Sequence, residues 1–254
     1  MPKCAMSRAG KAMGRCLLCM LVTAVPTAVN AGDEAFRLLT IDGYSGKWGD
    51  TTLGTGAVVS YAFVRAPQHF SDTGNCRHLV PMDSLAKRSG ISPAEIQREV
   101  AAAFRVWEEA GNISFVPAKD ADQADILIGA QGKPAGRAFA NIVHQEGSRN
   151  GVRAIDHARV CLNPEQPWKI GFDGNKDVYD IRYTLVHEIG HVIGLDHAGP
   201  SGQVMSFRYT ERYRELQAGD LRGLQRLYGP GSRGGPTAAG ETNQGSADIA
   251  ISPR

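Results

Sequence analysis

Residues 187–197 read His-Glu-Ile-Gly-His-Val-Ile-Gly-Leu-Asp-His. Because positions i and i+4 of an α-helix lie on the same face, His187 and His191 can present their imidazoles to one metal ion. The second glycine of the stretch allows a sharp turn after the helix, which would return His197 as a third ligand. Three neutral imidazoles with an open fourth position are typical of a catalytic zinc site, and Glu188 is placed to hold a water molecule beside the metal. The stretch therefore predicts one catalytic Zn²⁺ per chain.

Ordinary histidines on an amphipathic helix are the alternative explanation of this stretch. Five fixed positions, each matched by about one residue in twenty, would arise by chance in roughly one of ten thousand chains of this length. Helix packing also gives no reason for a glycine and a third histidine at these intervals. The metal site is therefore the prediction.

The stretch resembles the signature His-Glu-x-x-His-x-x-Gly-x-x-His of the metzincin zinc peptidases, which a methionine in a tight turn follows. Met205, eight residues after His197, resembles that methionine. The chain is most similar to the matrixin branch: residues 48–49 and 54–61 resemble its entry strand, 103–107 its first helix, 124–128 its third strand and 220–229 its closing helix. The resemblance spans nearly all of residues 45–229. It implies that Met205 underlies the metal site without binding it, and that a substrate peptide lies along the edge strand Arg137 to Val143.

Residues after the third histidine bear on the substrate pocket. Phe207 stands where serralysins and astacins have a tyrosine that reaches the zinc, which excludes a phenol ligand at this position. Tyr209 matches the matrixin tyrosine that walls the specificity pocket, although Phe207 replaces the usual proline. Ala198 departs from the Ser or Thr that usually follows the third histidine in matrixins. We expect an apolar pocket lined by Phe207 and Tyr209.

The N-terminal residues predict export. Residues 1–31 contain four basic residues and no acidic one, with a basic stretch, the apolar run Cys16 to Val29 and a small-residue cleavage pattern ending at Ala31. This is the pattern of a secretory signal peptide. A membrane anchor is the alternative, but a spanning helix needs about 20 apolar residues, whereas this run is only 14 residues long and has a proline inside it. We expect a mature protein that is secreted, or periplasmic in a Gram-negative host, and not inserted in a membrane.

Composition indicates an ordinary globular domain after this segment. The 254 residues are 42% hydrophobic and 21% charged, which excludes a fibrous, repeat-built or wholly disordered chain. Residues 32–254 hold 24 basic and 26 acidic side chains, so no basic excess supports a nucleic-acid partner. Residues 32–229 fit one catalytic domain, and residues 230–254 are too poor in large apolar side chains to fold, which predicts a disordered tail. We expect a monomer.

Strand and helix signals predict a strand, a helix, four strands and two helices. The expected ranges are a strand over 56–63, a loop of about 25 residues, a helix over 93–110, strands over 113–116, 124–130, 137–143 and 152–162, and helices over about 181–194 and 220–228. The capping box Ser92-Pro-Ala-Glu95 marks the start of the first helix. With the resemblance to matrixins, this order implies an α+β fold of the metzincin (zincin-like) type. Its twisted five-stranded mixed sheet would carry three helices, with the zinc site on the second helix.

Two cysteines, Cys76 and Cys161, remain after residue 31. In an oxidising compartment an even number predicts a disulfide, with free thiols as the alternative. A third interpretation makes Cys76 a zinc-directed thiolate that keeps an enzyme latent. The cysteine-switch propeptide of matrixins does not fit between Ala31 and the first strand, so we expect activity to be controlled without it.

Other metal sites are weaker predictions. Residues 173–177, Asp-Gly-Asn-Lys-Asp, alternate oxygen side chains as calcium ligands do, but valine and threonine replace the glycine and the bidentate glutamate of an EF-hand. A polar turn is the main interpretation of this segment, and Ca²⁺ is the alternative. His144, Asp156 and His157 are interpreted as surface residues rather than as a second zinc site.

The sequence thus predicts a secreted zinc endopeptidase that hydrolyses peptide bonds of proteins or peptides. In this hypothesis Glu188 is the general base that takes a proton from the attacking water. The first alternative is a secreted zinc-binding protein, or an inactive protease relative, that uses the fold for recognition. A zinc hydrolase acting on small amides is a third hypothesis, which the expected strand-edge cleft disfavours.

Overall fold

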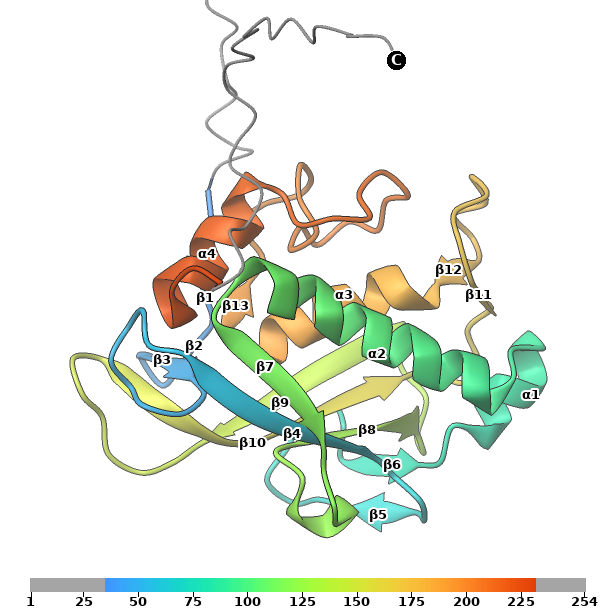
Figure 1. The fold of residues 1–254 in the computed structure, drawn as a ribbon. Helices are drawn as coiled ribbons and strands as arrows, with labels where there is room; N and C mark the ends of the chain where they lie inside the picture. Colours follow the sequence, from blue (N-terminus) through green and yellow to red (C-terminus); the bar gives the residue numbers. More distant parts are fainter. Residues whose placement is uncertain (1–34, 232–254) are drawn as a thin grey trace, which may run out of the picture.

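The computed structural model of the protein describes residues 35–231, and Figure 1 shows its fold. The predicted signal peptide, residues 1–31, lies outside the described residues, as does the predicted tail 230–254 apart from its first two residues. Between residues 35 and 231, no helix has the length and apolar character needed to cross a bilayer.

A mixed sheet forms the centre of the fold. Five of its strands have the spatial order β7 (Ile113–Pro117), β4 (Ala57–Phe63), β8 (Ile126–Gln131), β10 (Val152–Leu162) and β9 (Ala138–His144). The first four are parallel to one another, and β9 runs antiparallel to β10. The predicted α+β fold with a mixed sheet is confirmed, although short strands extend the sheet from the predicted five strands to nine.

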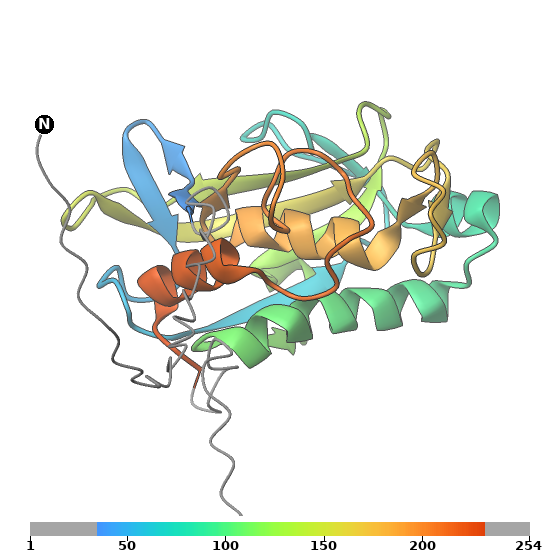
Figure 2. The ribbon, with the colours of Figure 1, turned by 90° about the horizontal axis from the view of Figure 1, so that it is seen from above.

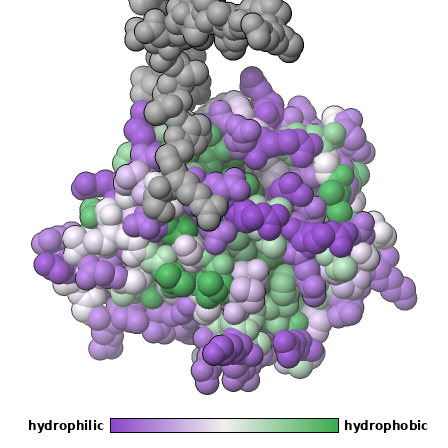
Figure 3. Space-filling view, in the orientation of Figure 1, coloured by the Kyte–Doolittle hydropathy of each residue, from purple (hydrophilic) through white to green (hydrophobic). Residues whose placement is uncertain are grey.

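The two edges of this five-stranded part differ. Apolar side chains gather over β4 and β7 in the space-filling view of Figure 3, and the exposed Val58 and Val116 belong to these strands. At the opposite edge, within residues 35–231, β9 pairs with β10 alone. Its other side therefore has backbone groups free to pair with an extended peptide.

Short strands extend the sheet or lie beside it. β2 (Thr40–Ile41) and β3 (Tyr44–Lys47) join the start of β10, and the hairpin of β5 (Gln68–His69) and β6 (His78–Val80) joins the end of β8. Two separate pairs are formed by β1 (Arg37–Leu38) with β13 (Leu195–Asp196), and by β11 (Trp168–Lys169) with β12 (Tyr179–Asp180). A 3-10 turn spans Ala121–Gln123.

Four α-helices occur in the described chain: α1 (Asp83–Ser89), α2 (Pro93–Ala110), α3 (Ile181–Val192) and α4 (Ala218–Tyr228). The last three correspond to the predicted helices, and α3 and α4 cover the same side of the sheet as α2 (Figures 1 and 2). The predicted loop of about 25 residues is wrong, because it contains β5, β6 and α1. Helix α1 has no side-chain hydrogen bond at its N-cap, so it lacks the local signal that marks α2.

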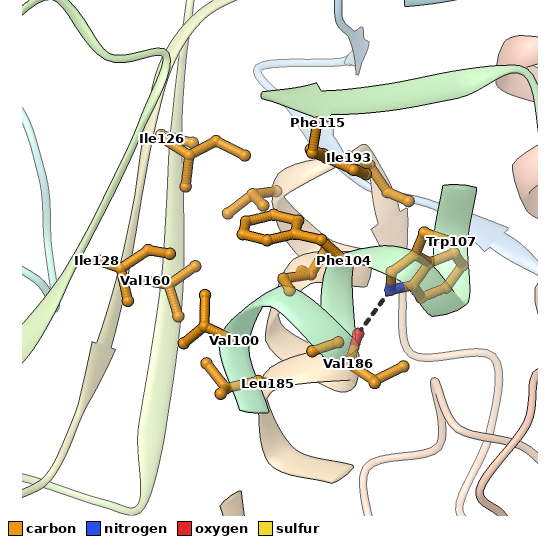
Figure 4. Packing of buried hydrophobic residues seen from close by; sticks show 14 of the residues in the cluster. Val100, Phe104, Trp107, Phe115, Ile126, Ile128, Val160, Leu185, Val186 and Ile193 are labelled. Carbon is orange, nitrogen blue, oxygen red and sulfur yellow. Dashed lines mark hydrogen bonds between the residues drawn. The ribbon is translucent and has the colours of Figure 1, made fainter. Parts of the chain in front are cut away.

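Helix α2 begins at the predicted capping box. Ser92 Oγ accepts a hydrogen bond from the Glu95 N–H (3.3 Å), and the Glu95 carboxylate accepts one from the Ser92 N–H (2.9 Å). The buried face of the helix carries Val100, Phe104 and Trp107, which pack against α3 and the sheet (Figure 4). This core fixes the distance between the sheet and α3.

Three buried side chains donate hydrogen bonds to backbone carbonyls of α3 and of the residue that caps it. The Trp107 indole N–H donates to Val186 O (3.0 Å; Figure 4). The Trp48 indole N–H donates to Val192 O (2.8 Å), and the Tyr228 hydroxyl donates to Ile193 O (2.8 Å). The last carbonyls of a helix have no partner inside the helix, so the bonds to Val192 and Ile193 stabilise the end of α3, whereas the Trp107 bond reaches its middle.

A disulfide joins Cys76 to Cys161 across 85 positions of sequence. Cys161 lies in β10, and the Cys76 N–H donates to the Asn141 side-chain oxygen of β9 (2.8 Å). The segment before β6 is thereby fastened to the sheet. Both cysteines are fully buried, so the interpretation of Cys76 as a zinc-directed thiolate is wrong in this fold.

Candidate metal centre

Helix α3 and the turn after it carry the three predicted metal ligands. The helix begins at Asp180, whose carboxylate accepts a hydrogen bond from a backbone N–H of the first turn (2.7 Å). His187 and His191 lie on its last turns. The chain then turns at Gly194, with φ of 103°, and passes through β13 to His197.

The three imidazoles converge on one point. Nε2 of His197 lies 3.0 Å from Nε2 of His187 and 3.2 Å from Nε2 of His191. Across residues 35–231, these histidines are the one group of three or more His, Cys, Asp or Glu side chains close enough to share a metal ion. The structure therefore brings the three predicted ligands together.

Backbone carbonyls hold the opposite ring nitrogens of two ligands. Nδ1 of His187 donates to Val204 O (2.7 Å), and Nδ1 of His191 donates to Leu195 O (2.8 Å). These bonds assign the proton to Nδ1 and leave the Nε2 lone pair for a metal.

The protonation states suit a metal as well. Burial lowers the pKa of His187 far below its usual value and that of His191 to about 4, so both rings are neutral near pH 7. Lone pairs at such short distances repel one another unless a cation lies among them. Three neutral imidazoles without a fourth protein ligand fit a Zn²⁺ ion with an open position.

Glu188 lies beside the ligands in a cleft of about 300 Å³. Its side chain is buried, and this burial raises the pKa of the carboxyl to about 7 while the positive charge of Arg137 opposes the rise. A carboxyl group with such a pKa can accept and return a proton near neutral pH.

Met205 packs against α3 at Gly190, near the C-terminal end of the helix. A Cβ atom added at Gly190 would lie 2.2 Å from Met205 Sδ and 2.9 Å from Trp107 Cζ2. Glycine at position 190 therefore allows the methionine to approach the helix between the two helical ligands. The side chain of Met205 is itself buried.

Asp220, in the first turn of α4, holds the turn that contains Met205, and sequence analysis did not single it out. Its buried carboxylate accepts hydrogen bonds from the N–H groups of Val204 (3.0 Å), Met205 (3.0 Å) and Gln217 (2.9 Å). Since Val204 O in turn accepts the proton of His187 Nδ1, Asp220 orients a metal ligand through one intervening residue.

Asp220→Asn should lower both stability and zinc affinity. An amide offers one acceptor oxygen where the carboxylate offers two, so at least one buried N–H loses its partner. We expect the free energy of unfolding to fall by about 2 kcal/mol and zinc affinity to fall by about tenfold. Urea unfolding and competition with a zinc indicator measure the two effects, with the exposed Asp177→Asn as the control. Unchanged zinc affinity would show that Asp220 does not position the site.

Phe207 and Tyr209, the two predicted pocket residues, differ in their exposure and in their contacts. Phe207 lines the cleft and is 53% exposed. The Tyr209 hydroxyl accepts a hydrogen bond from the Asp180 N–H (2.7 Å) and donates one to the Glu211 carboxylate (3.0 Å). The guanidinium of Arg137 lies 5.2 Å from the Tyr209 ring. Tyr209 is not among the residues that line the cleft, whereas Arg137 lines it and brings a cation to a pocket expected to be apolar.

The predicted calcium segment already faces a cation of the protein. The ammonium group of Lys169 contacts the Asp173 carboxylate, the Asn175 carbonyl (2.6 Å) and the Glu211 carboxylate (2.5 Å). Oxygen atoms that calcium would need are thus engaged by a lysine, which favours the interpretation of residues 173–177 as a polar turn.

The other histidines and acids considered for a second zinc lie apart from the centre. His157 is partly exposed, and its ring lies between the carboxylates of Asp72 and Asp156, 2.8 Å from each. His144 is also partly exposed. Their positions agree with the interpretation as surface residues.

Comparisons with known proteins agree with this geometry. Metalloendoproteinase 4-MMP of Arabidopsis thaliana is 30% identical over 170 residues, covering 62% of this chain and 48% of that protein. Stromelysin-3 of Rattus norvegicus is 31% identical over 149 residues, covering 53% of this chain and 27% of that protein. Matrix metalloproteinase-23 of Homo sapiens is 28% identical over 153 residues, covering 56% and 39% respectively. The chain thus spans less than half the length of each of these relatives.

A family model covers the metal centre as a whole. The model of the matrixins matches residues 82–229, which include the three histidines, Met205 and Asp220 as well as helices α1 to α4. This range is more than half of the sequence. Since the match and the arrangement of the metal ligands agree, the chain belongs to the matrixin family.

Proposed function

We propose that the protein is a zinc-dependent endopeptidase. The observation that carries this proposal is the convergence of three neutral imidazoles beside the buried carboxyl of Glu188, in a cleft that β9 borders. A structural zinc site would recruit a fourth protein ligand and would need no such carboxyl group. The relatives named metalloendoproteinase and matrix metalloproteinase support the same activity.

His187, His191 and His197 would hold the zinc ion, which when bound polarises the carbonyl of the peptide bond and acidifies a water molecule. Glu188 accepts the proton of that water as general base and returns it to the departing amine. The Val204 and Leu195 carbonyls keep the first two imidazoles in the orientation that binds metal.

The substrate would bind as an added strand. The outer edge of β9 has no partner strand among the described residues, and Ala138, Phe139 and Ala140 line the cleft beside the metal ligands. An extended peptide can form backbone hydrogen bonds along such an edge while the cleft receives its side chains. This mode of binding favours peptides over small amides.

Removal and return of the metal tests the proposed activity. The purified protein should cleave casein or gelatin, lose this activity in a chelator such as 1,10-phenanthroline, and regain it when Zn²⁺ is added after the chelator is removed. Calcium is not part of the proposal, so Ca²⁺ alone should not restore cleavage. A protein that binds one zinc and cleaves neither substrate would instead support the recognition hypothesis.

We also infer that the protein is exported, on the basic and apolar pattern of residues 1–31. A disulfide between Cys76 and Cys161 suits an oxidising compartment. Sequencing the N-terminus of the protein recovered outside the cytoplasm should give Gly32 as the first residue. An intact N-terminus in the cytoplasm would contradict export.

A further inference from the structure

Arg137 stands at the start of the predicted substrate strand. It directly precedes β9 and lines the same cleft as Glu188 and the three histidines. Its guanidinium carbon lies 5.0 Å from the centre of the Tyr179 ring and 5.2 Å from that of Tyr209. The two aromatic rings therefore hold a permanent cation at the edge of the metal centre.

No carboxylate of residues 35–231 pairs with this cation. Among the contacts within residues 35–231, the Arg137 guanidinium forms no ion pair and no hydrogen bond, and its Nε is buried without a partner. The nearby acids are engaged elsewhere: Asp180 caps α3, and Glu211 contacts Lys169. A guanidinium that has no acceptor in the protein can pair with one that a ligand supplies, so a ligand carboxylate in the cleft gains from binding here.

The charge balance of the cleft points to the same kind of ligand. Arg137 lines the cleft together with Glu188 and the metal ligands, and Asp196, the other acid that lines it, pairs with Arg37 (2.9 Å). Zinc held by the histidines would add two positive charges to that of Arg137, against which Glu188 supplies at most one negative charge. The cleft therefore attracts anionic side chains.

We propose that Arg137 determines substrate specificity by binding a glutamate or aspartate side chain of the peptide, in the cleft that it lines beside the metal ligands. This inference rests on the proposed peptidase function. The two tyrosine rings contact the Arg137 guanidinium through cation–π interactions. The N–H groups of the guanidinium can still pair with a carboxylate in the bidentate geometry that arginine favours. A purely apolar pocket would instead exclude such a side chain because it could not replace its hydration.

A peptide series tests the proposal. The peptides share one sequence and differ at a single position, which carries Glu, Gln, Leu or Lys. This position is varied in turn over the three residues on either side of the cleaved bond, and mass spectrometry confirms the cleavage site. At one position, wild-type protein should cleave the Glu peptide with at least about tenfold higher kcat/KM than the Gln peptide. In Arg137→Gln this Glu/Gln ratio should fall to about one, and Arg137→Glu should prefer Lys at the same position.

Arg153 offers a matched control. Like Arg137, it has a buried Nε without a partner and stacks on a tyrosine, with its guanidinium carbon 3.7 Å from the Tyr44 ring centre. It does not line the cleft. Arg153→Gln should therefore keep the wild-type Glu/Gln ratio, whereas Arg137→Lys should keep only part of it, because an ammonium group lacks the planar fork.

The outcomes separate this inference from the proposed function. Cleavage of the series without a Glu/Gln difference at any position overturns the role of Arg137 and leaves the peptidase intact. A Glu/Gln ratio that keeps its wild-type value in Arg137→Gln overturns the role of Arg137 as well, because the preference then does not depend on the guanidinium. Cleavage of no peptide by the zinc-loaded wild type overturns the peptidase function, and the inference with it.

Discussion

Glu188→Gln should lower kcat/KM for peptide cleavage by about three orders of magnitude, since a positioned general base contributes typically 10²–10⁴-fold. The amide has nearly the same shape as the carboxyl group but cannot accept the proton of the attacking water. Zinc content should stay at one ion per chain, because the ligands are His187, His191 and His197 and their supporting carbonyls are unchanged. Steady-state kinetics on a fluorogenic peptide and metal analysis of the same sample measure the two quantities.

The same Glu→Gln change on another helix is the control for the position of Glu188. Glu109 lies exposed on α2, so Glu109→Gln should change neither cleavage nor zinc content. Cleavage by Glu188→Gln at the wild-type rate would mean that another group takes the proton. Loss of zinc from the same variant would instead make the carboxyl group a metal ligand, contrary to the three-histidine site.

The parts of the fold that the sequence predicts correctly depend on local signals. The capping box at Ser92 and Glu95 involves neighbours three positions apart, and the structure contains it as predicted. The same holds for His187 and His191, whose spacing on one helix determines their proximity whatever the rest of the fold. Periodic and capping patterns of this kind are readable because the interacting residues are close in sequence.

The parts that the sequence did not reveal depend on contacts between distant residues. Asp220 is 15 and 16 positions away from the N–H groups of Met205 and Val204, and no periodicity links them. Arg137 meets Tyr179 and Tyr209 only because the start of β9, β12 and the segment after Met205 lie together in the fold. Helix α1 was missed for another reason, since it is short and has no side-chain cap.

Gly194→Ala should destabilise the fold and release the third metal ligand together. The backbone at this position has φ of 103°, a conformation that residues with a Cβ rarely adopt. An added Cβ would also lie 2.3 Å from the Gly46 carbonyl oxygen. Gly46 belongs to β3, which pairs with β10, so this neighbour cannot move without disturbing the sheet.

Strain of this backbone conformation and the steric clash each cost on the order of 1–3 kcal/mol. We therefore expect a loss of about 3 kcal/mol in the free energy of unfolding, which lowers the melting temperature by roughly 6–12 °C for a domain of this size. Because His197 follows three residues later, relief of the clash would displace it from the other ligands, and zinc affinity should fall by at least about tenfold. Gly199→Ala is the matched control, since an added Cβ there meets nothing within 4 Å. A Gly194→Ala protein that melts and binds zinc like Gly199→Ala would show that the turn into His197 does not require glycine.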